Sequence, residues 1–314
     1  MPLTELVHYF NKRSRLTRGG AAEDSFELAE GRVRVRFGGC LLGTVFQPVV
    51  ASASGQVIGH EAHLQLLEGG EADLPPSAIF LAARDDEELV HLDRLVRTLH
   101  ALNFLREREQ HGGFLSLNVH PQLLRTVREH HGQVFESILA RCGLTPERIV
   151  MEVSDDGFES LPRLTRALAG YRERGYRIAI DNFGRHSADL ERLESLAPDI
   201  VKLDRSLIGH AGHLSLAKRV MTELNGEIRR LGVLVVCQCI ENPLQLQAAR
   251  EAGVDWLQGY LLGRPAPACL PLPRPRRPRE AAWAAGLTCP LRPGSWPVPA
   301  GPGGQRQAGG DRQR

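Results

Sequence analysis

Hydrophobic and polar positions alternate along the chain in short runs that predict strands, and longer periodic segments between them predict helices. The predicted strands cover residues 45–50, 56–64, 112–121, 148–154, 176–183, 198–204, 232–240 and 254–261. The predicted helices cover residues 76–83, 87–106, 123–127, 134–142, 161–174, 215–231 and 243–251. Strands that alternate with helices are typical of parallel βα units, so we expect a (β/α)8 barrel. An open doubly wound sheet is the alternative, but no glycine-rich phosphate-binding sequence follows a strand.

The two ends of the chain differ from this regular middle part. Residues 1–40 are mixed in character, and we expect an N-terminal extension whose segment RVRVRF, at 32–37, is a short exposed strand. From residue 265 onward the chain holds 11 of its 20 prolines, and eight arginines against two acidic residues. Because such a composition buries little apolar surface, we predict a disordered tail at 269–314 after a barrel domain at 41–268. We favour a solvated tail over one whose arginines bind nucleic acid.

The remaining composition indicates a protein of the cytoplasm. Six cysteines are scattered along the chain without the paired spacing of a zinc site or of a disulfide scaffold. The N-terminal residues contain no long apolar core, so they do not resemble a signal peptide. No apolar run approaches the roughly 18 residues that a membrane-spanning helix needs. We therefore expect a cytoplasmic protein without a membrane span.

Polar side chains stand at or near the C-terminal ends of five predicted strands. They are Asn118, Glu152, Asp181, Lys202 and Gln238. A single polar residue at such a position is commonly the start of a loop or the cap of a helix. In a parallel barrel, however, the C-terminal ends of all strands meet on one face, where active sites lie. Five of them together therefore predict one shared functional site.

Oxygen-bearing side chains predict that this site binds a hard metal ion. They are the carboxylates of Glu61, Glu152 and Asp181 and the amide of Asn118. Such a set suits Mg²⁺ or Mn²⁺ better than zinc. Lys202 adds a positive charge that suits a phosphate group or the orientation of a water molecule. The combination favours metal-assisted hydrolysis of a phosphodiester.

Two histidines near the same strand ends are further candidates. Either His63 or His120 could act as a general base or as a metal ligand. A histidine near a strand end is more often a hydrogen-bonded structural group, so position alone assigns neither residue a role.

Six segments of the chain follow one another in an order and spacing that is specific to one family. They are FQPVVASASGQVIGHEAHL (46–64), LNVHP (117–121), MEVSDD (151–156), IAIDNFG (178–184), DIVKLDRSLI (199–208) and the stretch at 235–267. These segments resemble the EAL domain family, the cyclic di-GMP phosphodiesterases of bacterial second-messenger signalling, over residues 44–267. The resemblance implies a TIM-like (β/α)8 barrel whose first strand runs antiparallel. It also implies that two Mg²⁺ or Mn²⁺ ions activate a water molecule, which cleaves cyclic di-GMP to linear pGpG.

The resemblance implies a role for individual residues of this chain. The implied metal ligands are Glu61, Asn118, Glu152, Asp181 and Asn182. The implied catalytic residues are Lys202, Gln238 and Glu241, and the implied contacts to the cyclic dinucleotide are Gln65 and Gln258.

Several positions depart from the family pattern. Amides stand in place of acids at Asn182 and Gln238, and Gln65 stands in place of an arginine that contacts phosphate. The other departures are His63 in place of leucine, the shorter acid Asp155, and the sequence RHSADL at 185–190 in place of a Thr-Gly-Tyr-Ser type of loop.

The departures change the charge of the expected metal site. Glu61, Glu152 and Asp181 together with Lys202 have a net charge of −2, which matches one divalent cation better than two. We therefore expect a protein with impaired catalysis that acts by binding cyclic di-GMP or a protein partner. A second copy of the chain, in a homodimer, is one such partner. The alternative is an active Mg²⁺- or Mn²⁺-dependent phosphodiesterase that produces pGpG.

Overall fold

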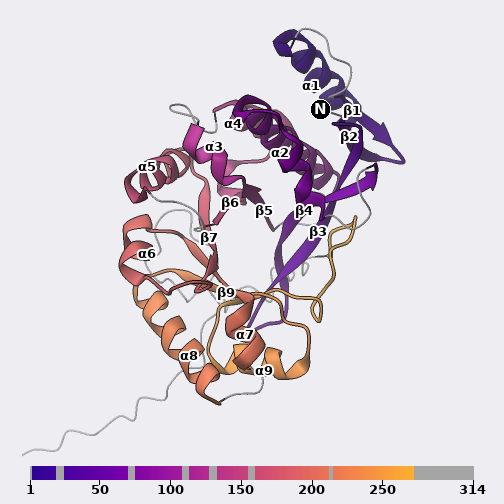
Figure 1. Ribbon diagram of the computed structural model, residues 1–314. Helices are drawn as coiled ribbons and strands as arrows, with labels where there is room; N and C mark the ends of the chain where they lie inside the picture. Colours follow the sequence, from indigo (N-terminus) through magenta and orange to yellow (C-terminus); the bar gives the residue numbers. More distant parts are fainter. Residues whose placement is uncertain are drawn as a thin grey trace, which may run out of the picture.

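The computed structural model describes residues 2–18, 25–69, 75–107, 113–126, 133–154, 160–211 and 215–271 as strands surrounded by helices (Figure 1). The strands are β1 (Phe26–Ala29), β2 (Arg32–Phe37), β3 (Cys40–Ala51), β4 (Val57–Glu68), β5 (Phe114–Val119), β6 (Ile149–Ser154), β7 (Arg177–Phe183), β8 (Ile200–Leu203), β9 (Leu234–Cys237) and β10 (Trp256–Leu257). The helices are α1 (Leu3–Arg18), α2 (Asp86–Glu107), α3 (Pro121–Thr126), α4 (Gln133–Cys142), α5 (Leu161–Arg172), α6 (Leu190–Leu196), α7 (Arg205–Ala211), α8 (Ser215–Arg230) and α9 (Pro243–Glu251), with the 3-10 helices η1 (Pro76–Ala82) and η2 (Pro146–Arg148). None of the helices in these ranges has the length and apolar character of a membrane span. Beyond residue 271 the expected disordered tail lies outside the described residues.

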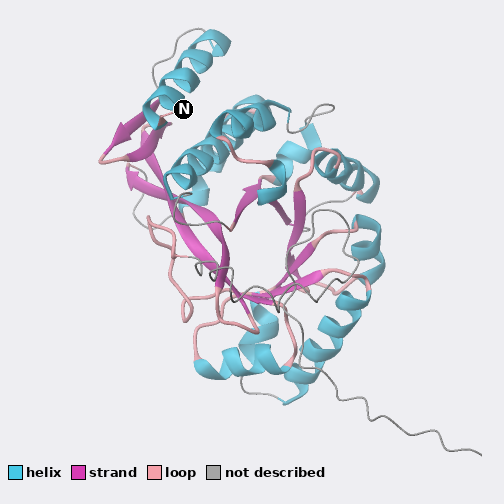
Figure 2. Ribbon diagram, turned by 180° about the vertical axis from the view of Figure 1, so that it is seen from behind, coloured by secondary structure: helices cyan, strands magenta, loops and turns pink. Residues whose placement is uncertain are grey.

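The strands from β3 to β10 close into a barrel. Strands β4 to β10 pair in sequence order and run parallel to one another. Strand β3 lies between β10 and β4 and is antiparallel to both. Helices lie around the outside of the barrel, as the two opposite views show (Figures 1 and 2). The expectation of a (β/α)8 barrel with an antiparallel first strand is confirmed, and the open doubly wound sheet is wrong.

Two further strands extend the sheet beyond β3. Strand β2 pairs antiparallel with both β1 and β3, so the N-terminal strands continue the sheet of the barrel. The expected strand at residues 32–37 is confirmed as β2, but the expectation that it is exposed is wrong, since Val33, Val35 and Phe37 are buried. The reason is helix α2, whose Asn103 side chain accepts a hydrogen bond from the Val33 N–H at 3.0 Å and donates one to the Val33 carbonyl at 2.8 Å. A strand held in this way buries one face of its alternating pattern.

An apolar layer closes the inside of the barrel near the N-terminal ends of the parallel strands. It consists of Val49, Phe114, Val150, Ala179, Ile200, Val236 and Trp256. The rings of Phe114 and Trp256 stack with their centroids 5.3 Å apart. Strand β4 contributes Gly59, where a Cβ atom would lie only 2.5 Å from the Phe114 ring. Only glycine fits there, and the layer forms a floor beneath the next inward-facing residues.

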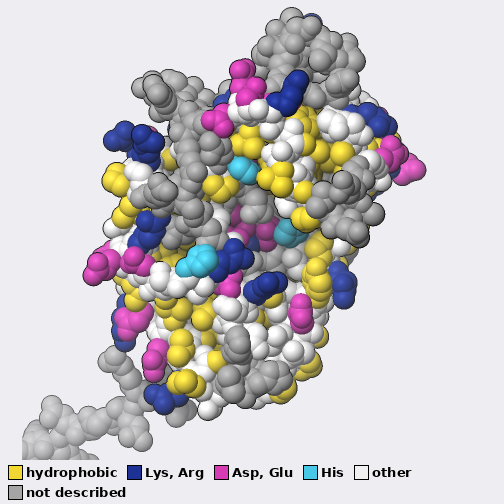
Figure 3. All heavy atoms as spheres, viewed as in Figure 1, with side chains coloured by type: hydrophobic (Ala, Val, Ile, Leu, Met, Phe, Trp, Pro, Cys, Tyr) yellow, Lys and Arg dark blue, Asp and Glu magenta, His cyan; other side chains and the backbone are white. Residues whose placement is uncertain are grey.

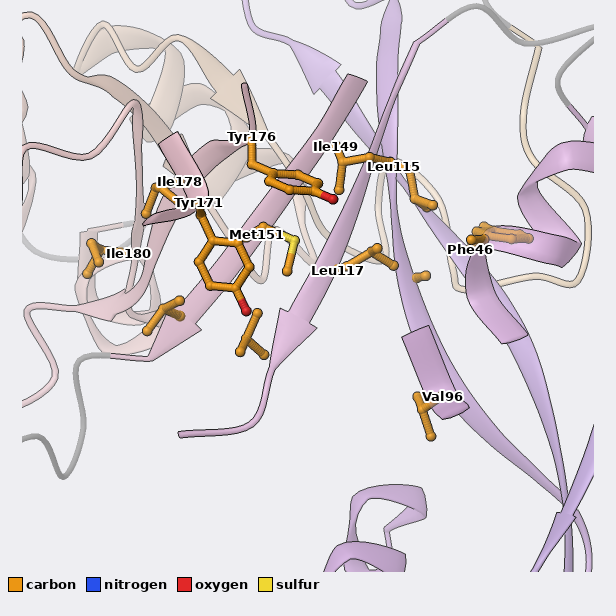
Figure 4. Close-up of a cluster of buried hydrophobic side chains, with 14 of the residues drawn as sticks. Phe46, Val96, Leu115, Leu117, Ile149, Met151, Tyr171, Tyr176, Ile178 and Ile180 are labelled. Atoms are coloured by element: carbon orange, nitrogen blue, oxygen red, sulfur yellow. The ribbon is translucent and has the colours of Figure 1, made fainter. Parts of the chain in front are cut away.

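A second apolar core fills the space between the strands and the helices. It contains outward-facing strand residues such as Leu115, Leu117 and Met151, which Figure 4 shows near Tyr171 and Tyr176. The two tyrosine rings meet edge to face with their centroids 5.8 Å apart. Because alternate strand residues point outward into this core, the positions between them point inward and are available for a site.

The imidazole of His100 is the buried polar group of this core with the clearest consequence for stability. Its Nδ1 lies 2.8 Å from the hydroxyl of Thr44 on β3. Burial lowers the pKa of His100 from its ordinary 6.5 to about 3, with a smaller contribution from the charge of His63. Below pH 6.5 the unfolded chain therefore takes up a proton that the folded chain does not, so stability should fall as the pH falls toward 3. Between pH 7 and pH 5 this one group should remove about 2 kcal/mol from the free energy of unfolding.

Urea denaturation at pH 7 and at pH 5 measures this loss. The variant His100→Gln serves as the control, because it retains every other titrating group and lacks only the imidazole. We expect the variant to be less stable at pH 7 but to lose less stability between the two pH values. An equal loss in both proteins would show that His100 is not the titrating group.

Candidate functional site

The inward-facing residues one step beyond the apolar floor are polar on every strand of the barrel. In the parallel strands each stands two positions after the floor residue, and in the antiparallel β3 it stands two positions before. They are Gln47, Glu61, Ser116, Glu152, Asp181, Lys202, Gln238 and Gln258, and we call them the polar layer. Figure 3 shows acidic side chains in a hollow near the middle of one face of the molecule, with histidine and basic side chains beside them.

Lys202 connects the buried acids of the polar layer. Its Nζ donates hydrogen bonds to Oε2 of Glu61 at 2.6 Å and to Oε2 of Glu152 at 2.8 Å, and all three residues are buried. Burial alone would lower the pKa of Lys202, but the charges of Glu152 and Glu61 raise it above its ordinary value. The lysine therefore remains protonated and holds together two carboxylates that would otherwise repel each other.

Glu61 accepts hydrogen bonds at both of its carboxylate oxygens. Asn118 Nδ2 lies 2.9 Å from Oε1, and Gln258 Nε2 lies 2.8 Å from the oxygen that Lys202 also contacts. Burial alone would raise the pKa of Glu61, but the ammonium group of Lys202 holds it well below its ordinary value. Gln258 also donates to Gln47 Oε1 at 3.3 Å, which ties Glu61 to its neighbour across the β3–β4 pair.

Glu152 differs from Glu61 in its surroundings. Burial, and next the charge of Glu61, raise the pKa of Glu152 above its ordinary value, whereas Lys202 opposes this rise. Its second oxygen, Oε1, accepts a hydrogen bond from the hydroxyl of Ser116. Ser116 and Gln47 were not among the residues predicted from the sequence. The two-residue spacing from the floor residues Phe114 and Val49 would have identified both.

Asp181 and Gln238 form a second, separate contact within the polar layer. Gln238 Nε2 donates a hydrogen bond to Asp181 Oδ1 at 2.7 Å, and it lies 3.4 Å from the carbonyl oxygen of Leu203. Both side chains are half-buried at the ends of β7 and β9. The carboxylate of Asp181 therefore faces a neutral amide donor.

Asn182 follows Asp181 in an unusual backbone conformation. Its φ angle is 58°, in the left-handed region that asparagine tolerates better than most residues. The pairing of β7 with β8 shifts register at the same place, between Ile180 and Phe183. The Asn182 carbonyl accepts a hydrogen bond from the Arg185 N–H at 3.2 Å. The local geometry therefore begins the turn out of β7 at the residue where the resemblance implies a second acid.

Some predicted residues lie apart from the polar layer. Gln65 is half-buried farther along β4, opposite Gly43 of β3. Glu241 is exposed, and its backbone N–H donates to the Gln245 side chain at 2.7 Å near the start of α9. Neither side chain has a hydrogen bond to the polar layer among the described residues. Asp155 lies outside them.

The two candidate histidines occupy different positions. His63 borders the polar layer, with its Nδ1 3.7 Å from Oε1 of Glu61. His120 stacks on the ring of Phe80 at a centroid distance of 5.2 Å, and its backbone N–H donates to Asp93 at 3.0 Å. His120 is therefore tied to η1 and α2, whereas His63 is the histidine adjacent to the buried acids.

The donor set does not fit the two divalent ions that the resemblance implies. Three carboxylates and Lys202 leave a net charge of −2, and each carboxylate already accepts hydrogen bonds from the protein. Within the described ranges, no three histidine, cysteine, aspartate or glutamate side chains form a group that could hold a metal ion. These residues are therefore joined to one another in a hydrogen-bonded network.

Comparison with known sequences identifies relatives over most of the folded chain. The EAL-domain containing protein YkuI of Bacillus subtilis is 27% identical over 225 residues, which cover 70% of this chain and 54% of YkuI. The cyclic di-GMP phosphodiesterase RocR of Pseudomonas aeruginosa is 29% identical over 229 residues, which cover 71% of this chain and 57% of RocR. The chain therefore spans about half the length of the curated relatives it matches.

Comparison with solved structures finds the same barrel. The Bacillus subtilis YkuI protein in complex with cyclic di-GMP and calcium superposes with a TM-score of 0.63 at 26% identity, covering 74% of this chain and 57% of that one. The manganese and cyclic di-GMP complex of Klebsiella pneumoniae BlrP1 superposes with a TM-score of 0.66 at 22% identity, covering 80% of this chain and 61% of that one. The family model of the EAL domain matches residues 31–265. The sequence motifs, the barrel and this match together show that the chain belongs to the EAL domain family.

Proposed function

We propose that this protein acts in cyclic di-GMP signalling by binding cyclic di-GMP, or a protein partner, with impaired catalysis. The observation that supports the proposal most strongly is the 2.7 Å hydrogen bond from Gln238 to Asp181. A carboxylate that holds a catalytic cation is expected to face that cation, whereas this one faces an amide.

The charge of the polar layer supports the same proposal. Its net charge of −2 matches one Mg²⁺ or Mn²⁺ ion, and two-metal hydrolysis needs an ion beside both the attacking and the leaving oxygen. Losing one electrostatic stabiliser of a transition state typically slows a reaction by about 10²–10³. Asn182 and Gln238 are two such losses in one site, and their effects need not add. We therefore propose a site for at most one ion, with little turnover.

Ligand recognition is the part of the family function that the retained residues support. Lys202 supplies a positive charge near the floor of the hollow, and Gln258 is buried beside Glu61 with an amide oxygen that has no hydrogen-bond partner among the described residues. A neutral Gln65 in place of an arginine weakens the expected contact to a phosphate. We propose that the chain binds cyclic di-GMP with measurable but weakened affinity. We also propose that the protein is cytoplasmic, and that its protein partner could be a second copy of the same chain.

An active phosphodiesterase that produces pGpG is the second candidate. The observation in its favour is that Glu61, Glu152, Asp181 and Lys202, to which the resemblance gives a metal-binding or catalytic role, all belong to the polar layer inside the barrel. The two candidates share the ligand and differ in whether it is cleaved.

Calorimetric titration of cyclic di-GMP into the purified chain tests the binding proposal. We expect a saturable heat of binding that is weakened in the Lys202→Met and Gln258→Ala variants and unchanged in Gln247→Ala, which lies exposed on α9. Binding that is absent in the wild-type chain would exclude the ligand and leave only the protein partner. Binding that is the same in all four proteins would place the ligand outside the polar layer.

A further inference from the structure

The amide of Gln238 has an orientation that its neighbours determine. Its Nε2 lies 2.7 Å from Asp181 Oδ1 and 3.4 Å from the Leu203 carbonyl oxygen, so both neighbours are acceptors. The reverse orientation would place the amide oxygen against two other oxygens with no proton between them. The NH₂ group of Gln238 therefore faces Asp181, so Gln238 is the donor and the Asp181 carboxylate is the acceptor of this hydrogen bond.

This NH₂ group stands where the carboxylate would meet a cation. Hard divalent ions bind carboxylate oxygens at roughly 2.0–2.6 Å, and an amide nitrogen at hydrogen-bond distance blocks that approach to the same oxygen. The amide supplies only a partial positive charge, but it does so without needing an ion from solution. Gln238 follows β9 and contacts Leu203 of β8 and Asp181 of β7, which are the next two strands of the sheet. These contacts fix the Asp181 side chain relative to β8 and β9.

The neighbouring residues do not restore the attraction for an ion. Asn182 is neutral and has the left-handed φ of 58° that starts the turn. Lys202 already lies between Glu61 and Glu152, which gives those carboxylates an internal positive charge of their own. Among the described residues, Asp181 is thus the one carboxylate of the polar layer whose hydrogen bonds include no cationic side chain.

We infer that Gln238 takes the place of a second divalent cation on Asp181 and, as a positioning residue, keeps that cation out of the site. The inference shares the contact between Gln238 and Asp181 with the proposed function. Its test involves no cyclic di-GMP, so the two can fail separately.

Mn²⁺ titration of the intact chain, followed by the electron paramagnetic resonance signal of the free ion, counts the ions that bind. The wild-type chain should bind at most one Mn²⁺. The double variant Asn182→Asp with Gln238→Glu should bind a second ion at least about tenfold more tightly, since ligand charge sets the affinity of such sites. A wild-type chain that binds two ions as tightly as the double variant would overturn the inference.

Two further variants separate the local contact from a general change of charge. Gln65→Glu adds one negative charge on β4, half of the charge that the double variant adds, and should leave the number of bound ions as in the wild-type chain. Gln238→Ala removes the amide without adding charge, and should raise Mn²⁺ affinity to a value between those of the wild-type chain and the double variant. A gain in Gln65→Glu equal to that of the double variant, or no gain in Gln238→Ala, would overturn the inference.

Discussion

Replacing Lys202 with methionine should lower the free energy of unfolding by about 3–5 kcal/mol, the usual effect of removing one partner from a buried ion pair. The ammonium group contacts Glu61 at 2.6 Å and Glu152 at 2.8 Å, and all three residues are buried. Without it, two buried carboxylates would lie close together with no cation between them. Urea denaturation in the presence of a chelator measures the loss, since the chelator prevents a metal ion from replacing the lysine.

Two variants show whether this loss comes from the buried charges. Lys218→Met removes a lysine of the same size from an exposed pair with Glu251, and should change stability by no more than about 0.5 kcal/mol. Lys202→Met with Glu152→Gln should recover part of the loss, because only one buried carboxylate remains. If Lys202→Met is tolerated as well as Lys218→Met, the three buried groups do not form the network described above.

Restoring the two acids should raise turnover. Asn182→Asp together with Gln238→Glu adds two negative charges beside Asp181, which changes the net charge of the site from −2 to −4 and matches two divalent ions. We expect hydrolysis of cyclic di-GMP to rise by about 10² or more over the wild-type chain, the usual contribution of one electrostatic stabiliser. Chromatography of the pGpG product in the presence of Mn²⁺ measures both rates.

The matched control for this gain is Gln247→Glu. It makes one such change from an amide to an acid on the exposed side of α9, away from the barrel interior. Turnover in this variant should equal that of the wild-type chain. The double variant could also bind more Mn²⁺ and yet have the wild-type rate. In that case metal content does not limit catalysis, and Gln65 or the loop at 185–190 would be the next cause of low turnover to test.

The barrel could be predicted from the sequence because its strands alternate so regularly. The predicted strand at 176–183 corresponds to β7 (Arg177–Phe183), and the predicted helix at 243–251 corresponds to α9. Helix α1 (Leu3–Arg18) was not predicted, because its pattern is mixed and its burial depends on packing of Leu6, Val7 and Phe10 within the core. Helices α6 and α7 have seven residues each, which is too short for a helical period to stand out.

The site could be predicted only in part. Polar residues at strand ends identified Glu152 and Asp181, the set of oxygen-bearing side chains added Glu61, and the resemblance to the family singled out Gln238 as a departure. The sequence could not show that Gln238 bonds to Asp181, which is 57 positions away, because that contact depends on the order and stagger of the strands. It also did not show that Lys202 bridges two acids, which only the three-dimensional arrangement reveals.

The rate at which the wild-type chain hydrolyses cyclic di-GMP tests the central claim most directly. Purified chain is incubated with cyclic di-GMP and either Mg²⁺ or Mn²⁺, and the pGpG formed is followed over time. Our account predicts a rate far below 1 s⁻¹, which is about the low end for ordinary enzymes. Turnover near 1 s⁻¹ or above by the unmodified chain would contradict it.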